Sequence, residues 1–179
     1  MATPDNEGVG LKPSRTDPVL DACDALFMTE STEKAVPNPS VKKHTGGCHC
    51  GAVRFEVMID TSAGTMCNCS ICAKTAQLGT SVKPDAFKLT AGADSLSKYE
   101  WGSKIGQRMF CKHCGVHCFG PGYLEQLGGA FVSVNLRCID GFDPVDAKVM
   151  HWDGRHDNWQ SGPRSTPWPI APAGSNASP

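Results

Sequence analysis

The feature that most constrains this chain is a set of seven cysteines arranged in three short motifs. They read C-H-C-G at Cys48 and Cys50, C-N-C-S-I-C at Cys67, Cys69 and Cys72, and C-K-H-C-G at Cys111 and Cys114. A C-x-x-C turn brings two thiols together easily, whereas a C-x-C pair on a flat strand leaves them too far apart. We therefore expect the chain to bend at His49 and Asn68, with both C-x-C pairs at strand ends or turns.

Cysteines spaced in this way are typical of zinc sites. Zinc takes four thiolate or imidazole ligands in a tetrahedron with Zn–S bonds of about 2.3 Å, so the sulfurs must converge to about 3.7 Å from one another. The glycines that follow two of the motifs, Gly51 and Gly115, supply the unusual backbone angles that such turns need. The motifs therefore predict bound zinc.

The number of cysteines indicates chemistry as well as structure. Two closed all-cysteine sites need eight ligands, whereas the seven present here make one site of four and one of three. Structural zinc sites are closed, and catalytic ones keep three protein ligands and an exchangeable fourth position. Spacing does not say which cysteines share a metal. Joining the C-x-C pair to the distant C-x-x-C pair would leave the C-x-C-x-x-C triplet for the open site.

Other interpretations stay open at this point. The triplet could be metal-free and redox active, or the cysteines could form disulfides. A further protein ligand could also close the second site and make the protein purely structural, the candidates being Cys118, His44, His49, His113 and His117. Cys23, Cys118 and Cys138 otherwise lie in apolar surroundings and are interpreted as buried or semi-buried thiols.

The net charge and the hydropathy of the sequence limit the cell compartment and the classes of partner that we expect for this protein. With 17 Lys and Arg against 18 Asp and Glu, the formal net charge is -1, which argues against a protein that coats nucleic acid or an anionic membrane. No stretch approaches the roughly 20 apolar residues of a spanning helix, and residues 1–15 lack an apolar secretion signal. We expect a soluble cytoplasmic protein with a small-molecule partner, no nucleic acid and no membrane. In that compartment reduced thiols favour metal ligands over disulfides, and the oligomeric state stays open.

Composition divides the chain into four segments. Residues 1–44 form a largely irregular extension, apart from an apolar island at residues 19–28 that could make two helical turns. Residues 45–152 are predicted to be the zinc-binding β domain. Residues 153–170 carry Trp159 and Trp168, whose large rings should pack on that domain as an arm. Residues 171–179 are predicted to be a disordered tail.

Alternation of apolar and polar residues predicts the strands of the β domain. In AVRFEVMID, the apolar side chains of Val53, Phe55, Val57 and Ile59 fall on one face. Further strands are predicted at residues 79–83, 87–90, 96–101, 107–110, 130–136 and 148–152, between Gly, Pro, Asp and Ser turns. No long amphipathic helix is expected. The predicted fold class is mainly β, a small antiparallel domain pinned by zinc.

The cysteine motifs and their flanking residues resemble the glutathione-dependent formaldehyde-activating enzyme family, which includes the centromere protein V group. The resemblance covers residues 45–152 and rests on TGGCHCGAVRFEV, MCNCSICAKTAQ and RMFCKHCGVHCF, in the order and spacing of that family. It implies a zinc-pinned fold of the β-tent type. By this resemblance, the structural zinc ligands are Cys48, Cys50, Cys111 and Cys114, and the catalytic zinc ligands are Cys67, Cys69 and Cys72.

The activity that the resemblance implies is formation or cleavage of a carbon–sulfur bond on a glutathione adduct, as in S-(hydroxymethyl)glutathione synthesis from formaldehyde. Three thiolates on zinc carry a net charge of about -1, so a glutathione thiolate would make it about -2 and would need nearby cations. Lys74, Arg54 and Arg108 are the candidates. At Asn68 and Ala73 the chain departs from the family, whose members commonly carry histidine and arginine there, so it lacks a positive charge near the proposed substrate.

We therefore predict a zinc-dependent carbon–sulfur lyase with one zinc at each of two sites and glutathione as possible co-substrate. One alternative is a non-catalytic zinc module that binds a protein partner through the tryptophan arm or the N-terminal extension. Another is a lyase or isomerase of a biosynthetic pathway that uses the same zinc on a larger electrophile without glutathione. The sequence does not identify the residue that moves the proton.

Overall fold

The computed structural model describes residues 39–171. The predictions for residues 19–28, Cys23 and residues 172–179 lie outside the described residues. The strands are β1 (Lys42–Gly47), β2 (Arg54–Ile59), β3 (Ala63–Cys67), β4 (Gly79–Val82), β5 (Phe87–Ala91), β6 (Leu96–Tyr99), β7 (Arg108–Cys111), β8 (His117–Leu124), β9 (Gly129–Asn135) and β10 (Lys148–Trp152). The helices are α2 (Ser70–Thr75) and the 3-10 turns η1 (Pro84–Ala86), η2 (Ala93–Ser95), η3 (Glu125–Leu127), η4 (Leu136–Cys138), η5 (Pro144–Asp146) and η6 (Trp159–Ser161).

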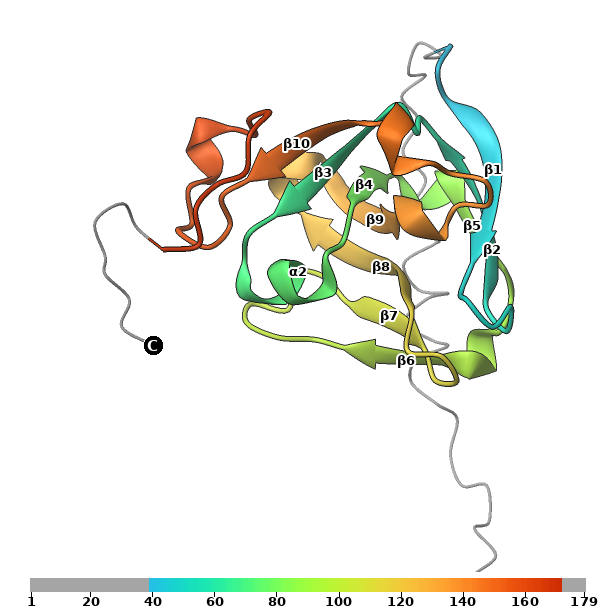
Figure 1. Cartoon of the computed structure of the whole chain (residues 1–179). Coiled ribbons are helices and arrows are strands. Elements are labelled where there is room, and N and C mark those ends of the chain that lie inside the picture. The colour runs from blue at the N-terminus through green and yellow to red at the C-terminus, as the bar shows by residue number, and fades with distance from the viewer. Residues whose placement is uncertain (1–38, 172–179) are drawn as a thin grey trace, which may run out of the picture.

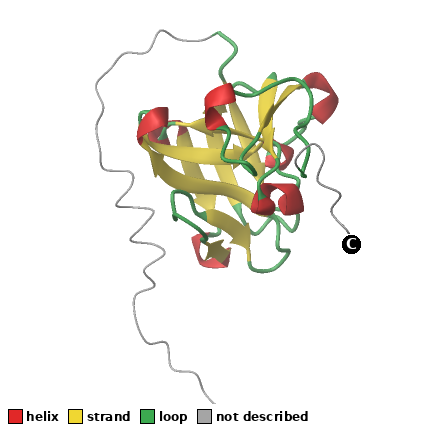
Figure 2. Cartoon of the chain, turned by 90° about the vertical axis from the view of Figure 1, so that its left-hand side faces the viewer, coloured by secondary structure: helices red, strands yellow, loops and turns green. Residues whose placement is uncertain are grey.

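The strands form two sheets, which confirms the mainly β fold class. One sheet has the order β1-β2-β5 and the other has the order β10-β3-β4-β9-β8-β7-β6 (Figure 1). The short helices lie at the periphery of the strands (Figure 2). One pairing differs from the mainly antiparallel arrangement, because β10 pairs with β3 in parallel. The chain returns through η4 and η5 before β10, and this long connection lets the strand enter in the same direction as β3.

Each of the seven strands expected from alternation is found, and three further strands within residues 39–171 were missed. The missed strands are β1, β3 and β8, with the sequences KKHTGG, AGTMC and HCFGPGYL. Glycine and proline in these segments resemble turns, since proline cannot donate a ladder hydrogen bond and glycine favours other conformations. Tertiary pairing overrides this local preference. The first strand also begins at Lys42, before the expected domain start at residue 45.

The hydrophobic core lies between the two sheets. The alternation predicted for β2 is confirmed, because Phe55, Val57 and Ile59 are buried. The ring of Phe55 lies 5.3 Å from that of Phe87 on β5 and 6.0 Å from that of Phe119 on β8, centroid to centroid. Phe87 and Phe119 are 4.6 Å apart. These aromatic contacts join the small sheet to the middle of the large one.

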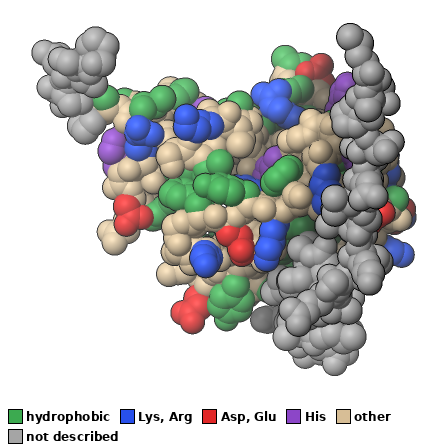
Figure 3. Space-filling view, turned by 90° about the horizontal axis from the view of Figure 1, so that it is seen from below, with side chains coloured by type: hydrophobic (Ala, Val, Ile, Leu, Met, Phe, Trp, Pro, Cys, Tyr) green, Lys and Arg blue, Asp and Glu red, His purple; other side chains and the backbone are tan. Residues whose placement is uncertain are grey.

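Large apolar side chains remain exposed on β6 and the loop after it. Tyr99 is 50% exposed, Trp101 43% and Ile105 44%. Seen from below, where β6 is the lowest strand of Figure 1, apolar side chains gather among Lys and Arg side chains (Figure 3).

Among residues 39–171, no helix has the length and apolar character needed to cross a membrane.

The central strand β8 requires a glycine at position 120. A Cβ atom built there would lie 1.8 Å from the backbone oxygen of Gln107. Backbone atoms cannot move aside as a flexible side chain can, so any larger residue would push β8 away from the segment that leads into β7. Gly106 in the same ribbon has room, because its Cβ would meet nothing closer than 3.8 Å.

We expect Gly120→Ala to destabilise the protein by about 1–3 kcal/mol or more, as overpacking of a tight site does. The matched control Gly106→Ala should stay within about 0.5–1 kcal/mol of the wild type, because its Cβ has ordinary contacts. Urea unfolding followed by circular dichroism measures both. Equal unfolding midpoints for the two variants would contradict this account of β8.

Candidate metal centre and active site

Four cysteines from two turns converge at one point. Cys48 and Cys50 lie in the turn between β1 and β2, while Cys111 ends β7 and Cys114 precedes β8. Their four sulfurs all lie within 4.8 Å of one another. The Sγ atoms of Cys48 and Cys50 are 3.5 Å apart, and those of Cys50 and Cys111 are 3.6 Å apart. These separations are close to the roughly 3.7 Å expected of sulfurs around a tetrahedral zinc ion.

The backbone of both turns favours ionised sulfur. The backbone N–H of Val53 donates to the Sγ atom of Cys48 over 3.3 Å. A hydrogen bond from the backbone of Val116 lowers the pKa of Cys114 to about 6. As predicted, the glycines after the second cysteines adopt left-handed angles, with φ of +81° at Gly51 and +71° at Gly115. Because metal ligands must be deprotonated, this donor set fits a metal ion.

The triplet forms a second cluster where β3 meets α2. Cys67 ends β3, Cys69 is the N-cap residue of α2, and Cys72 lies within that helix. Their sulfurs lie within 4.8 Å of one another. The backbone N–H of Cys69 donates to the Sγ atom of Cys67 over 3.4 Å. The prediction that both C-x-C pairs lie at strand ends or turns is confirmed.

The three sulfurs of the triplet oppose one another's ionisation. Hydrogen bonds from the thiols of Cys67 and Cys72 lower the pKa of Cys69 to about 2. The same contacts raise the pKa of Cys67 and of Cys72, because each would ionise beside an existing thiolate. Full deprotonation therefore needs a cation among the sulfurs. Soft thiolates in this number fit zinc better than a hard cation such as magnesium.

Within residues 39–171 no further protein ligand joins the triplet. No other cysteine sulfur, histidine nitrogen or carboxylate oxygen lies within 4.8 Å of all three sulfurs. Cys118 instead lies in the core, where its thiol donates to the backbone oxygen of Val116 over 3.6 Å. The histidines considered for a closing ligand are likewise absent from both clusters. The described residues therefore give a four-cysteine group and a three-cysteine group.

The three candidate cations lie in different places. Arg108 on β7 donates from Nη2 to the Sγ atom of Cys72 over 3.6 Å. Lys74 lies on α2 and is exposed. Arg54 pairs with Asp140, and its raised pKa comes mainly from this hydrogen bond. The structure therefore brings Arg108 to the triplet, while Arg54 is held at a carboxylate elsewhere.

The side chain of Asn68, between two cysteines of the triplet, connects the site to the C-terminal arm. Its Nδ2 atom donates to Asp153 over 2.7 Å and to the backbone oxygen of Pro169 over 3.1 Å, and its Oδ1 atom accepts from the N–H of Arg155 over 2.9 Å. Asp153 is 4% exposed. Burial opposes its ionisation, but hydrogen bonds from Asn68, His156 and neighbouring Asn158 hold its pKa below the ordinary value. Asn68 thus fixes the turn that carries Cys67 and Cys69.

Sequence reasoning missed Asp153, because a single aspartate after a strand has no pattern that marks it as buried. It also missed Gly154. A Cβ atom at Gly154 would lie 2.6 Å from the Sγ atom of Cys67 and 2.7 Å from the ring of Trp159. Glycine at this position lets the chain after β10 pass directly against the triplet.

The tryptophans of the C-terminal segment contact β10. The ring of Trp159 lies 5.9 Å from that of Trp152, and it remains 49% exposed. The indole N–H of Trp168 donates to the backbone oxygen of His151 over 2.9 Å. The guanidinium of Arg164 lies 3.7 Å from the centre of the Trp168 ring.

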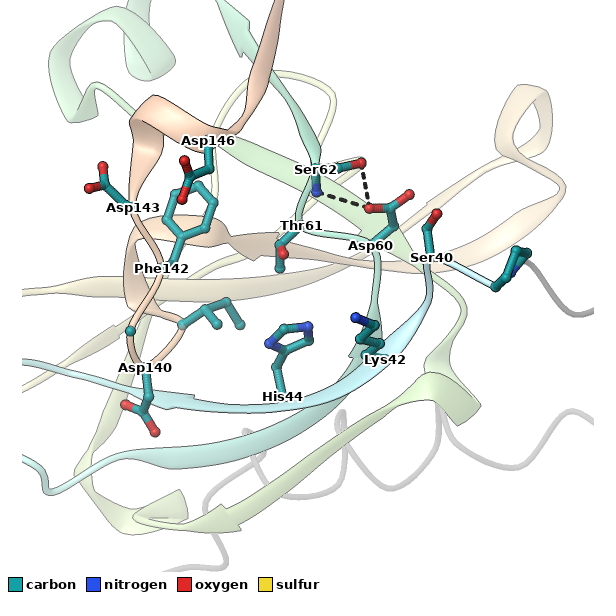
Figure 4. A pocket seen from close by; sticks show the side chains of 13 residues that line it. Ser40, Lys42, His44, Asp60, Thr61, Ser62, Asp140, Phe142, Asp143 and Asp146 are labelled. Carbon is teal, nitrogen blue, oxygen red and sulfur yellow. Dashed lines mark hydrogen bonds between the residues drawn. The ribbon is translucent and has the colours of Figure 1, made fainter.

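A separate pocket lies at the other end of the fold. It is formed by the start of β1, the turn after β2 and the segment around η5, and His44, Asp60 and Asp143 are among the side chains that line it (Figure 4). Asp60 accepts from the N–H and hydroxyl of Ser62 over 2.9 and 2.7 Å. No cysteine lines this pocket, so it is distinct from both sulfur clusters.

Comparison with known proteins supports the resemblance noted in the sequence. A family model described as glutathione-dependent formaldehyde-activating enzyme matches residues 43–155. Two curated proteins assigned by name to glutathione-dependent formaldehyde activation are similar. The one from Penicillium rubens is 38% identical over 79 residues, which are 41% of this chain and 41% of that protein. The one from Halomonas elongata is 40% identical over 78 residues, 38% of this chain and 50% of that protein.

A solved structure shares the fold. The crystal structure of a Rhodobacter sphaeroides protein is 26% identical to this chain with a TM-score of 0.51, and the match covers 57% of this chain and 93% of that one. The chain spans about half the length of the curated relatives it matches.

We expect Gly154→Ala to weaken metal binding at the triplet by about 10-fold or more, as changes to residues that support ligands do. The added methyl group would be too close to both the sulfur of Cys67 and the ring of Trp159, so both must shift or the backbone must move. Competition with a chromophoric chelator measures the affinity. Gly106→Ala serves as control and should keep the wild-type affinity. An unchanged affinity in Gly154→Ala would contradict the close contact.

Proposed function

Since the chain belongs to the glutathione-dependent formaldehyde-activating enzyme family, we propose that it is a zinc-dependent carbon–sulfur lyase. Its substrate would be the adduct of glutathione with a small aldehyde, S-(hydroxymethyl)glutathione being the adduct of formaldehyde. The observation that carries the proposal is the triplet, in which three sulfurs converge without a further protein ligand among the described residues. Three protein ligands are typical of catalytic zinc, and four are typical of structural zinc.

Both sulfur clusters have a place in this proposal. Cys48, Cys50, Cys111 and Cys114 would hold a structural zinc ion, and Cys67, Cys69 and Cys72 would hold the catalytic one. When bound, the catalytic ion supplies Lewis acidity that lowers the pKa of a substrate thiol and polarises an aldehyde oxygen. The glutathione thiol and the aldehyde would therefore meet beside the triplet.

The surrounding residues supply charge and orientation. The positive charge of Arg108 lies beside the sulfur of Cys72, where it would offset the negative charge that a glutathione thiolate adds. The positive charge of Arg108 would replace the positive charge that Ala73 does not provide. Exposed Lys74 remains a candidate for the carboxylates of the tripeptide, while Arg54, paired with Asp140, becomes the weakest of the three candidates.

The C-terminal segment would shield the reacting sulfur. Gly154 brings this segment against Cys67, and the hydrogen bonds of Asn68 to Asp153 and Pro169 hold it there. Shielding of one side of the triplet from water would strengthen electrostatic interactions at the site. Reduced glutathione is also part of the reaction, so a cytoplasmic location belongs to the proposal.

We expect metal-loaded protein to accelerate the exchange between ¹³C-formaldehyde and its glutathione adduct, measured by two-dimensional exchange NMR. Cys67→Ser should lose the metal of the triplet, keep the metal of the four-cysteine cluster and stay folded, with the exchange rate reduced by about 100-fold or more. Cys111→Ser should instead lose stability, because structural zinc contributes folding energy. Elemental analysis and thermal unfolding accompany the rates.

The outcomes separate the alternatives. If Cys67→Ser unfolded and the wild type showed no exchange, a non-catalytic zinc module that binds a protein partner would be favoured. If the triplet turned over a larger electrophile without glutathione, the recruited lyase or isomerase would be favoured. Wild-type protein that holds metal at both clusters and neither binds glutathione nor accelerates exchange would contradict the proposed function.

A further inference from the structure

Three buried polar atoms in the described part of the chain have no hydrogen-bond partner, and they belong to two neighbouring side chains. They are Nε of Arg108 and both ring nitrogens, Nδ1 and Nε2, of His117. Leaving a buried donor or acceptor unpaired costs about 1–3 kcal/mol, so such groups need an explanation. One of the two side chains, Arg108, already contacts the triplet through Nη2.

The strand register places His117 and Arg108 on one face of the large sheet. His117 on β8 is the partner of Phe110 on β7, and Arg108 lies two residues before Phe110. Partners in a regular register share a face, and so do residues two apart on one strand. A β-bulge interrupts the register of β7 and β8 between Met109 and Phe110, but the charge of Arg108 lowers the pKa of His117, which indicates that the two side chains are close together. Met109, which lies between Arg108 and Phe110 on β7, is fully buried in the core on the opposite face. Diagonal neighbours on one face lie about 7–8 Å apart, within reach of long side chains.

This face is also the one that meets α2. The hydrogen bond from Arg108 to Cys72 joins the start of β7 to that helix. Nε and Nη2 belong to the same planar guanidinium. A ligand atom that accepts from Nε would therefore lie close to the sulfur of Cys72.

Neighbouring polar side chains are satisfied. The Nδ2 atom of Asn135 donates to the backbone oxygen of His117 over 2.9 Å, and its Oδ1 atom accepts from the N–H of Arg137 over 3.2 Å. The Nε2 atom of Gln77 donates to the hydroxyl of Ser133 over 3.3 Å. The unpaired nitrogens are therefore specific to Arg108 and His117 and do not reflect a generally poor hydrogen-bond network.

The surroundings of His117 favour its neutral form. Burial lowers its pKa to about 4, and the positive charge of Arg108 adds to this effect. A weak hydrogen bond with the backbone of Phe119 offsets the lowering in part, and neither ring nitrogen has a partner with normal hydrogen-bond geometry. A neutral imidazole offers one donor and one acceptor. Together with Nε of Arg108, it is complementary to a hydroxyl group, which accepts one hydrogen bond and donates another.

We propose that Arg108 and His117 form the oxygen-binding subsite for the adduct, in which Nε of Arg108 donates to the adduct hydroxyl and a ring nitrogen of His117 takes its proton. This inference rests on the proposed function and supplies the proton-transfer residue that the sequence does not identify. His117 was considered in the sequence as a ligand that closes the second site. Its absence from both sulfur clusters and its unpaired nitrogens point to the substrate instead.

The step balances without an added oxidant or reductant. In the cleavage direction the carbon–sulfur bond breaks and its electron pair stays on the glutathione sulfur. The O–H bond of the hydroxymethyl group breaks, its electron pair forms the second carbon–oxygen bond of formaldehyde, and its proton moves to His117. The imidazolium then returns the proton to the thiolate through solvent, so the adduct yields formaldehyde and glutathione. Adduct formation follows the same bond and proton changes in reverse, with the same two residues.

The test compares His117→Gln with the wild type as metal-loaded proteins. Glutamine keeps hydrogen-bonding capacity and cannot carry a proton between partners. We expect the kcat of ¹³C-formaldehyde exchange to fall by about 100-fold or more, with little change in KM for glutathione, because general acid–base groups contribute about 10²–10⁴-fold. His44→Gln, on β1 in the other sheet, is the matched control and should exchange at the wild-type rate.

Two readouts do not depend on activity. Metal content and the dissociation constant of S-methylglutathione, which lacks the hydroxyl, should be the same in His117→Gln and the wild type. In the ¹⁵N spectrum, the His117 ring should show a neutral imidazole without metal coordination. Its signals should shift with glutathione and formaldehyde together and stay unchanged with S-methylglutathione.

Several results would overturn the inference. Coordination of a metal by His117 in the ¹⁵N spectrum would make it a ligand, and wild-type exchange rates in His117→Gln would remove its role in proton transfer. In both cases an active wild type would leave the proposed function intact. A metal-loaded wild type that neither binds S-methylglutathione nor accelerates exchange would remove the proposed function and this inference together.

A second variant tests the other side chain of the subsite. Arg108→Lys, which keeps the charge and loses Nε, should show the same fall in kcat as His117→Gln.

Discussion

The convergence of sulfur atoms at two points is the interaction on which the rest of the structure depends. Thiols this close cannot all ionise unless a cation lies among them, because each thiolate raises the pKa of the next. The four-cysteine cluster joins the turn between β1 and β2 to the turn between β7 and β8, so it ties the small sheet to the large one. The packing of Phe55, Phe87 and Phe119 crosses the same interface. The convergence of these sulfurs and the aromatic packing therefore both connect the two sheets.

The triplet depends on a different set of contacts. One side is held by the C-terminal segment, through Asn68, Asp153 and the close passage of Gly154. The other side faces β7 and β8, where Arg108 reaches Cys72 and where the three unpaired nitrogens lie. The four-cysteine cluster is formed by two backbone turns, and the triplet has polar side chains beside it. In the proposed function, this asymmetry separates the structural centre from the reactive one, although both consist of cysteine sulfurs.

The predictions of the fold succeeded where local sequence carries the information. Strand β2 was found because Phe55, Val57 and Ile59 alternate with polar residues, and the bends of the C-x-C pairs were found because sulfur geometry requires them. Strand β8 was missed because Gly120, Pro121 and Gly122 resemble a turn. Its place in the middle of the sheet comes from pairing with β7 and β9, and such pairing is not encoded in any short segment. The zinc ligands and the domain boundaries remain predictions.

The sequence by itself determined the donor chemistry and the number of sulfurs, because residue type and spacing are local properties. Spacing alone left open which sulfurs share a point, and the tertiary structure groups them as the family resemblance implied. Only the tertiary structure decided which of Lys74, Arg54 and Arg108 lies beside the triplet. Arg108 and Cys72 are 36 positions apart, so their contact depends on the order of strands and on how α2 lies over them. The same holds for His117. Its place beside Arg108 follows from the register of β7 and β8, because register decides which side chains share a face.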